Sequence, residues 1–225
     1  MGSSIVFING SPNPKGCTWR SMVEVSKVLH EEGFTIEWIH VGNRPVRGCM
    51  GCNACKDSGL SRCIYGDDVV NVAISRMEQA DGLVIGSPVH FGAASGAVIS
   101  FLDRMFYAAN AEKTFYGKPG ASIVCCRRGG ATSALEQLNK YFMINNMPMV
   151  PSYYWNMAHG NTIREVEHDS EGMFIMRQVG RNLAWMIKSL KAAKEQGITF
   201  PYADDVVRMN FIREHPKDLF EGFTE

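Results

Sequence analysis

Four of the seven cysteines crowd between positions 49 and 63, and thiols at this spacing can bind a metal or carry redox chemistry. They are Cys49, Cys52, Cys55 and Cys63. Two successive CxxC steps place three sulfurs around one loop, and a fourth sulfur a few residues on can close the site. Three interpretations stay open: a [4Fe–4S] cluster, free or oxidation-sensitive thiols in a structural loop, and zinc.

A glycine- and proline-rich loop, residues 10–18, follows the first apolar run of the chain and precedes the first helical pattern. Backbone N–H groups at such a junction, together with the positive end of the helix, can hold an anion. The hydroxyls of Ser11 and Thr18 add neutral donors that suit a phosphate monoester. The loop lacks the Walker pattern and GxGxxG, which argues against a nucleoside triphosphate or a Rossmann dinucleotide. The alternative is a plain turn with a helix cap at Thr18.

Two further loops follow later apolar runs of the chain. Residues 86–92 follow one run, where Pro88 stiffens the turn and Gly92 allows close backbone approach. Arg127 and Arg128 follow the next run. Ligands of open α/β sheets bind outside the carboxyl ends of the strands, so we expect these loops to meet at one edge of the sheet.

The elements that must position these loops alternate between strands and helices. Short apolar runs predict strands, and amphipathic segments between them predict helices. The predicted strands are residues 3–9, 34–41 (nearer a sheet edge), 82–87, 121–126 and part of 148–155, and the predicted helices are 18–32, 69–80 after an Asp67 or Asp68 cap, 93–108, 131–145 and 171–194. This order predicts an α/β fold with a doubly wound, five-stranded parallel sheet and helices on both faces.

The length of 225 residues predicts one domain, residues 1–195, followed by a carboxyl-terminal extension, residues 196–225, which we expect to pack on the domain or on a partner subunit. Cys125 and Cys126 end a buried strand and read as small core residues. The core candidates of the final helix are Phe174, Leu183, Trp185 and Leu190.

Composition excludes several classes of partner. Lysine and arginine together number 23, as do aspartate and glutamate, so no global field favours nucleic acid or an acidic membrane surface. The amino terminus lacks the pattern of a signal peptide, and no run of about 18 apolar residues is present. We therefore expect a cytoplasmic protein that binds neither nucleic acid nor membrane.

Both binding loops resemble those of the flavodoxin-like NADPH-dependent FMN reductase family. Residues 10–18 are similar to the GSPRKxGNT-type phosphate loop of that family, matching at Ser11, Gly16 and Thr18. Asn13 stands where an arginine is frequent and Cys17 where an asparagine is frequent, but backbone donors at Gly16 and Cys17 survive either change. Residues 87–104 are similar to the more specific SPVYxGxxSxxxKxFxDR signature.

The resemblance implies a flavodoxin-like fold with FMN at the carboxyl edge of the sheet. His90, which stands where tyrosine is common, would stack on the flavin ring or bond to it, or is simply a partly exposed loop residue. Arg127 and Arg128 would face the flavin pyrimidine or the phosphates of a nicotinamide nucleotide, or are solvated charges. Asp103 and Arg104 are read as an ion pair or a subunit contact. The implied FMN-binding residues are Ser11, Asn13, Gly16, Cys17, Thr18, Pro88, Val89, His90, Phe91, Gly92, Arg127 and Arg128.

The implied activity is transfer of electrons from NAD(P)H through FMN to an unidentified acceptor, in a homodimer or homotetramer. Hydride transfer requires positioning and no side-chain acid or base, so we name no catalytic residue. The cysteine spacing resembles that of the iron-sulfur flavoprotein branch, which implies a [4Fe–4S] cluster on Cys49, Cys52, Cys55 and Cys63 as an alternative. A flavodoxin-type electron carrier that does not oxidise nicotinamide is a second rival function, and a thiol redox sensor is a third.

Overall fold

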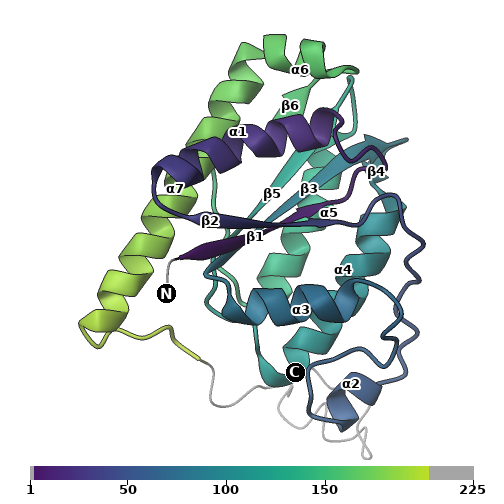
Figure 1. Cartoon of the computed structure of the whole chain (residues 1–225), viewed down its shortest axis with the longest axis vertical. Coiled ribbons are helices and arrows are strands. Elements are labelled where there is room, and N and C mark those ends of the chain that lie inside the picture. Colours follow the sequence, from purple (N-terminus) through teal and green to yellow (C-terminus); the bar gives the residue numbers. More distant parts are fainter. Residues whose placement is uncertain (1–2, 203–225) are drawn as a thin grey trace, which may run out of the picture.

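The computed structural model describes residues 3–202. Its centre is a parallel sheet in the order β2-β1-β3-β5-β6, with the short β4 paired antiparallel to β3 (Figure 1). The strands are β1 (Ser4–Asn9), β2 (Thr35–His40), β3 (Gly82–His90), β4 (Ala93–Ala94), β5 (Gly120–Cys126) and β6 (Met157–His159). Five parallel strands alternating with helices confirm the predicted flavodoxin-like α/β fold.

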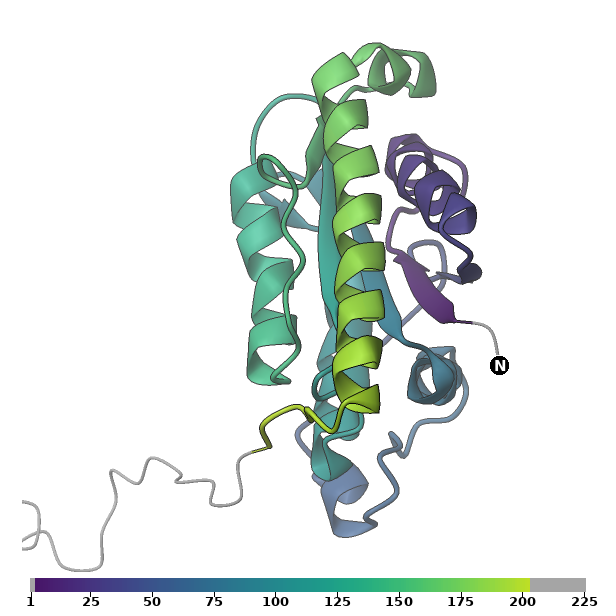
Figure 2. The ribbon, with the colours of Figure 1, turned by 90° about the vertical axis from the view of Figure 1, so that its left-hand side faces the viewer.

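Helices cover both faces of the sheet, which Figure 2 shows edge-on. One layer holds α1 (Cys17–Glu31) and α7 (Ser170–Glu195), and the other holds α3 (Val70–Gln79), α4 (Gly96–Ala109) and α5 (Ala131–Ile144). Shorter pieces are α2 (Ala54–Asp57), the 3₁₀ turn η1 (Asn110–Glu112) and α6 (Ile163–His168). A hydrophobic core lies on each face of the sheet, and the side chains of β1 alternate between the two. Ile5 and Phe7 pack toward α1 and α7, whereas Val6 and Ile8 pack toward the opposite layer.

Three details of the sequence prediction are wrong. The last strand is Met157–His159, and residues 148–155 contribute only an isolated bridge at Met149. Helix α1 begins at Cys17 after Gly16 and no side chain caps it, so Thr18 is not a cap. On α7, Leu183 is buried as predicted, but Trp185 is 67% and Phe174 39% exposed, because that face of the helix looks away from the sheet.

The carboxyl-terminal extension enters the described part of the chain only as far as residue 202. Here Tyr202 stacks on Tyr116, with ring centroids 6.4 Å apart. Residues 203–225 lie outside the described residues, and so does most of the predicted extension. Within residues 3–202, no helix has the length and apolarity needed to cross a bilayer.

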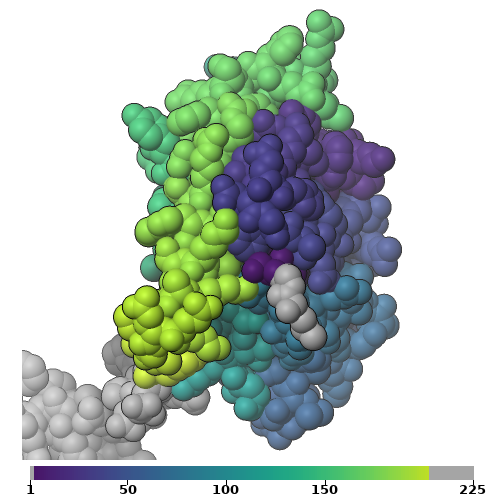
Figure 3. All heavy atoms as spheres, turned by 60° about the vertical axis from the view of Figure 1, so that its left-hand side comes forward, coloured from purple at the N-terminus to yellow at the C-terminus, as the bar shows by residue number. Residues whose placement is uncertain are grey.

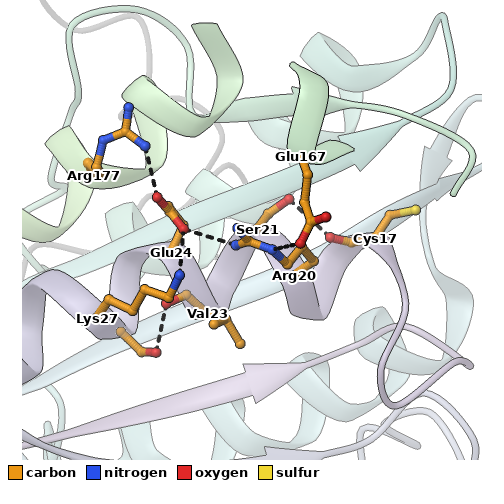
Figure 4. A network of polar contacts seen from close by, with 9 residues as sticks. Cys17, Arg20, Ser21, Val23, Glu24, Lys27, Glu167 and Arg177 are labelled. Atoms are coloured by element: carbon orange, nitrogen blue, oxygen red, sulfur yellow. Dashed lines mark hydrogen bonds and ion pairs between the residues drawn. The ribbon is translucent and has the colours of Figure 1, made fainter. Parts of the chain in front are cut away.

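A network of charged side chains joins α1 to α6 and α7, which lie against it (Figures 3 and 4). Glu24 accepts hydrogen bonds from Arg20 at 2.9 Å and from Arg177 of α7 at 2.8 Å. Arg20 also reaches Glu167 of α6 at 2.8 Å. Burial alone raises the pKa of Glu24, but the bonds from Arg177 and Arg20 and the charge of Lys27 outweigh it, so the pKa lies below its usual value.

A Glu24→Gln variant is expected to lower the free energy of unfolding by about 2 kcal/mol at neutral pH, because two charge-assisted bonds lose their acceptor charge. The pKa of Glu24 is lower in the folded protein, so its contribution is complete above the unfolded value of about 4.3 and is lost as pH falls through the folded pKa. Urea unfolding at several pH values should therefore show wild type and variant converging in acid. The control Glu32→Gln, which removes a pair with Lys188 that is half exposed, should cost less than about 1 kcal/mol.

Candidate functional site

A cavity of about 520 Å³ lies at the carboxyl edge of the sheet, where the loops after β1, β5 and β6 meet the end of β3. The family resemblance implied twelve FMN-binding residues, and most but not all of them line this cavity. Nine of the twelve line it: Ser11, Asn13, Gly16, Cys17, Thr18, Pro88, Val89, His90 and Arg127. Phe91, Gly92 and Arg128 lie outside its lining, and Phe91 is fully exposed beside it.

The floor of the cavity is the amino end of α1. No side chain caps this helix and its first turn holds no acidic residue, so no side chain of the helix itself competes for its first N–H groups. Those groups and the helix dipole favour an anion. The preceding loop is held close to the sheet, since the Gly10 amide donates to the Gly86 carbonyl at 2.8 Å.

The end of β3, just before the tight turn to β4, forms a second wall. The Ser87 hydroxyl accepts from the Ser95 amide at 2.9 Å and donates to the Pro88 carbonyl at 2.8 Å, which fixes both ends of the turn. At its tip Phe91 has φ 57°, a conformation that non-glycine residues seldom adopt. Pro88, Val89 and His90, the last residues of β3, line the cavity.

The loop after β6 forms a third wall that the sequence analysis missed. Gly160, Asn161, Thr162 and Ile163 line the cavity beside Arg127. Thr162 caps α6 and forms a capping box with Glu165. This Thr-x-x-Glu pattern was the available signal, because it marks a helix start and therefore the end of the preceding strand. The sequence analysis placed the last strand too early in the chain and therefore did not use this signal.

Three thiols line the inner end of the same cavity. Burial raises the pKa of Cys17, and it raises the pKa of Cys125 to about 12. With Cys126, whose pKa burial also raises, they stay protonated at neutral pH and act as small apolar residues.

The segment from 41 to 69 carries the other four cysteines to a separate hollow of about 20 Å³ against α4. Cys49, Cys52, Cys55 and Cys63 all line it, together with Arg104 and Tyr107. Burial raises the pKa of Cys55. Cysteine is the natural donor for an iron-sulfur cluster or zinc, so the donor set fits either. Across residues 3–202, however, no three His, Cys, Asp or Glu side chains are grouped as they would be around a metal ion.

Arg104, which the sequence analysis interpreted together with Asp103 as an ion pair or a subunit contact, anchors this segment. It is 2% exposed and forms its ion pair with Asp68, whereas Asp103 accepts from the Tyr141 hydroxyl. The guanidinium also donates to Cys63 Sγ at 3.3 Å and to the Tyr65 carbonyl at 3.0 Å. Arg104 lies eight residues, or about 12 Å of helical rise, beyond the start of α4. The cysteine hollow is therefore set back from the carboxyl edge.

Known proteins resemble this chain in sequence and in fold. The family model for NADPH-dependent FMN reductase matches residues 3–162. An iron-sulfur flavoprotein of Methanocaldococcus jannaschii is 29% identical over 194 residues, covering 83% of this chain and 98% of the relative. Among solved structures, RosB with bound 8-demethyl-8-formylriboflavin-5′-phosphate has TM-score 0.65 at 15% identity, covering 95% and 93% of the two chains. An NAD(P)H:quinone oxidoreductase of Methanothermobacter marburgensis has TM-score 0.61 at 14% identity, covering 81% and 98%.

Proposed function

The chain belongs to the NADPH-dependent FMN reductase family, and from that premise we propose that it is an FMN-dependent oxidoreductase that takes electrons from a reduced nicotinamide nucleotide and passes them to a second acceptor. One observation carries the proposal. It is the cavity at the carboxyl edge, where an uncapped helix amino terminus forms the floor and the end of β3 forms a wall.

The residues of the cavity fit FMN. Its volume lies within the range of about 300 to 1,000 Å³ that is usual for small-molecule sites. We assign the phosphate to the backbone donors of Cys17 and Thr18, because the Gly16 amide already donates to the Asn13 carbonyl at 3.2 Å. We assign the flavin ring to Pro88, Val89 and His90 at the end of β3. When bound, FMN supplies the redox chemistry, because it accepts a hydride and releases electrons singly or in pairs.

The chain's own contribution is position. Hydride transfer needs the two reacting atoms about 3 to 3.5 Å apart, so the nicotinamide must stack against an exposed face of the flavin. Arg127 lines the cavity with its side chain exposed, which suits the phosphates of the incoming nucleotide or the flavin pyrimidine. The exposed ring of Phe91 offers a flat apolar surface at the rim.

An anaerobic reduction experiment tests the proposal. Apoprotein is loaded with FMN, and NADPH or NADH is added in steps while the flavin absorbance is recorded. We expect complete bleaching at about one equivalent of nucleotide. A flavin that binds but is reduced only by a one-electron donor, and by neither nucleotide, contradicts nicotinamide oxidation and supports an electron carrier instead.

A second candidate, an iron-sulfur flavoprotein, rests on the four thiols around one hollow and on the similarity to proteins of that name. In this candidate Cys49, Cys52, Cys55 and Cys63 would hold the cluster, which would supply electron-transfer chemistry. Iron and sulfide analysis after anaerobic purification separates the candidates. About four iron and four sulfide per chain support the [4Fe–4S] cluster. Bound zinc supports a structural metal site, and reactive thiols without any metal support a structural loop with free thiols. The homodimer or homotetramer stays a prediction.

A further inference from the structure

The geometry points to His40 and Asn9 as positioning residues that hold the phosphate loop, residues 10–16, in its anion-binding shape and thereby set the affinity for the flavin phosphate. This inference rests on the proposed FMN site. It assigns a role in cofactor binding to β2, whose residues do not line the cavity.

His40 ends β2 beside Asn9, its register partner on β1. Its Nε2 lies 2.7 Å from the Ser11 carbonyl oxygen. A carbonyl can only accept, so Nε2 carries the proton and donates. The imidazole is half-buried, and its bond ties the second residue of the phosphate loop to the sheet edge.

Asn9 holds the same loop from the other side. Asn9 is 2% exposed, and both the oxygen and the nitrogen of its side-chain amide form hydrogen bonds with the loop. Oδ1 accepts from the Ser11 amide at 3.1 Å, and Nδ2 donates to the Pro14 carbonyl at 3.2 Å. The N–H and C=O of Ser11 are therefore both bonded to side chains outside the loop.

The composition of the loop explains why it needs this support. Inside the loop, the amides of Asn13, Lys15 and Gly16 donate to Ser11 Oγ, Asn13 Oδ1 and the Asn13 carbonyl. Pro12 and Pro14 have no N–H, so the backbone of Ser11 depends on its bonds to Asn9 and His40. An anion site also requires carbonyl oxygens to point away from the ligand, and the bond to His40 holds one such oxygen. A loop that populates its binding shape only part of the time binds correspondingly more weakly.

The test compares FMN with riboflavin, which lacks the phosphate, by fluorescence titration of full-length apoprotein. For His40→Ala we expect FMN to bind about five- to tenfold more weakly, the loss of one net hydrogen bond, while riboflavin binding stays within about twofold of wild type. His40→Gln keeps a donor at this position and should recover most of the FMN affinity.

The control is His30→Ala. His30 Nδ1 also contacts a backbone carbonyl, that of Phe34 at 3.0 Å, but at the opposite end of β2 from the cavity. This variant should bind both flavins like wild type. Unchanged FMN affinity in His40→Ala, or equal losses for FMN and riboflavin, overturns the inference. A wild-type protein that binds neither flavin overturns the proposed function, and the inference with it.

Discussion

A Gly42→Ala variant is expected to lose FMN affinity by about 100-fold or more, since displacing binding groups by about 1 Å commonly has effects of this size. Gly42 follows β2, and a Cβ built there lies 2.1 Å from the Ser11 carbonyl oxygen, 2.2 Å from the Ser11 carbonyl carbon and 2.6 Å from the Gly10 oxygen. All three atoms are backbone of the phosphate loop. The loop must therefore move away from Gly42 to admit even a methyl group. Fluorescence titration with FMN measures the loss.

Gly48→Ala is the matched control in the same segment. A Cβ there meets nothing closer than Ser100 Oγ at 3.9 Å, which is ordinary contact. This variant should bind FMN like wild type. If Gly42→Ala retains wild-type affinity, the phosphate does not depend on the loop that Gly42 touches.

Replacing Arg104 with methionine is expected to lower the free energy of unfolding by about 3 kcal/mol or more, the usual cost of breaking a buried ion pair. The Arg104 side chain is 1% and the Asp68 side chain 13% exposed, so the variant leaves a largely buried carboxylate without its cation. Cys63 Sγ and the Tyr65 carbonyl lose their donors at the same time. Urea unfolding measures the stability, and the alkylation rate of Cys63 measures the loosening of the cysteine segment.

Arg62→Met provides the comparison, because Arg62 also anchors this segment but through a more exposed pair. Arg62 and Glu78 are 30% and 29% exposed, and such pairs contribute about 1 kcal/mol or less. Equal losses in the two variants would contradict the anchoring role of Arg104.

Much of the fold followed from local patterns. The buried runs ending at Asn9, Ser87 and Cys126 correctly predicted three parallel strands, because a strand covered on both faces reads as a continuous apolar run. Since such strands share an edge, the loops after them were expected together, and nine predicted residues do line one cavity.

The failures have physical causes. Residues 153–155, Tyr-Tyr-Trp, have high strand propensity, yet all three side chains are more than half exposed in a loop before β6. The sequence analysis considered Arg104 together with its neighbour Asp103, because a sequence shows only which residues are close along the chain. Its actual partner, Asp68, is 36 positions away and is brought there only by packing of the segment against α4.

The segment from 41 to 69 connects the two candidate sites. It starts with Gly42 against the phosphate loop and ends with Asp68 on Arg104, and it carries the four cysteines between these anchors. Substitutions at its two ends should therefore separate its effects on flavin binding from those on the cysteine hollow.

A crystal structure of the FMN-loaded protein tests the central claim most directly. We predict the phosphate against the amides of Cys17 and Thr18, and the flavin ring along Pro88 to His90, in the cavity lined by these residues. Flavin density anywhere else, such as over the cysteine hollow or along α7, would contradict the account.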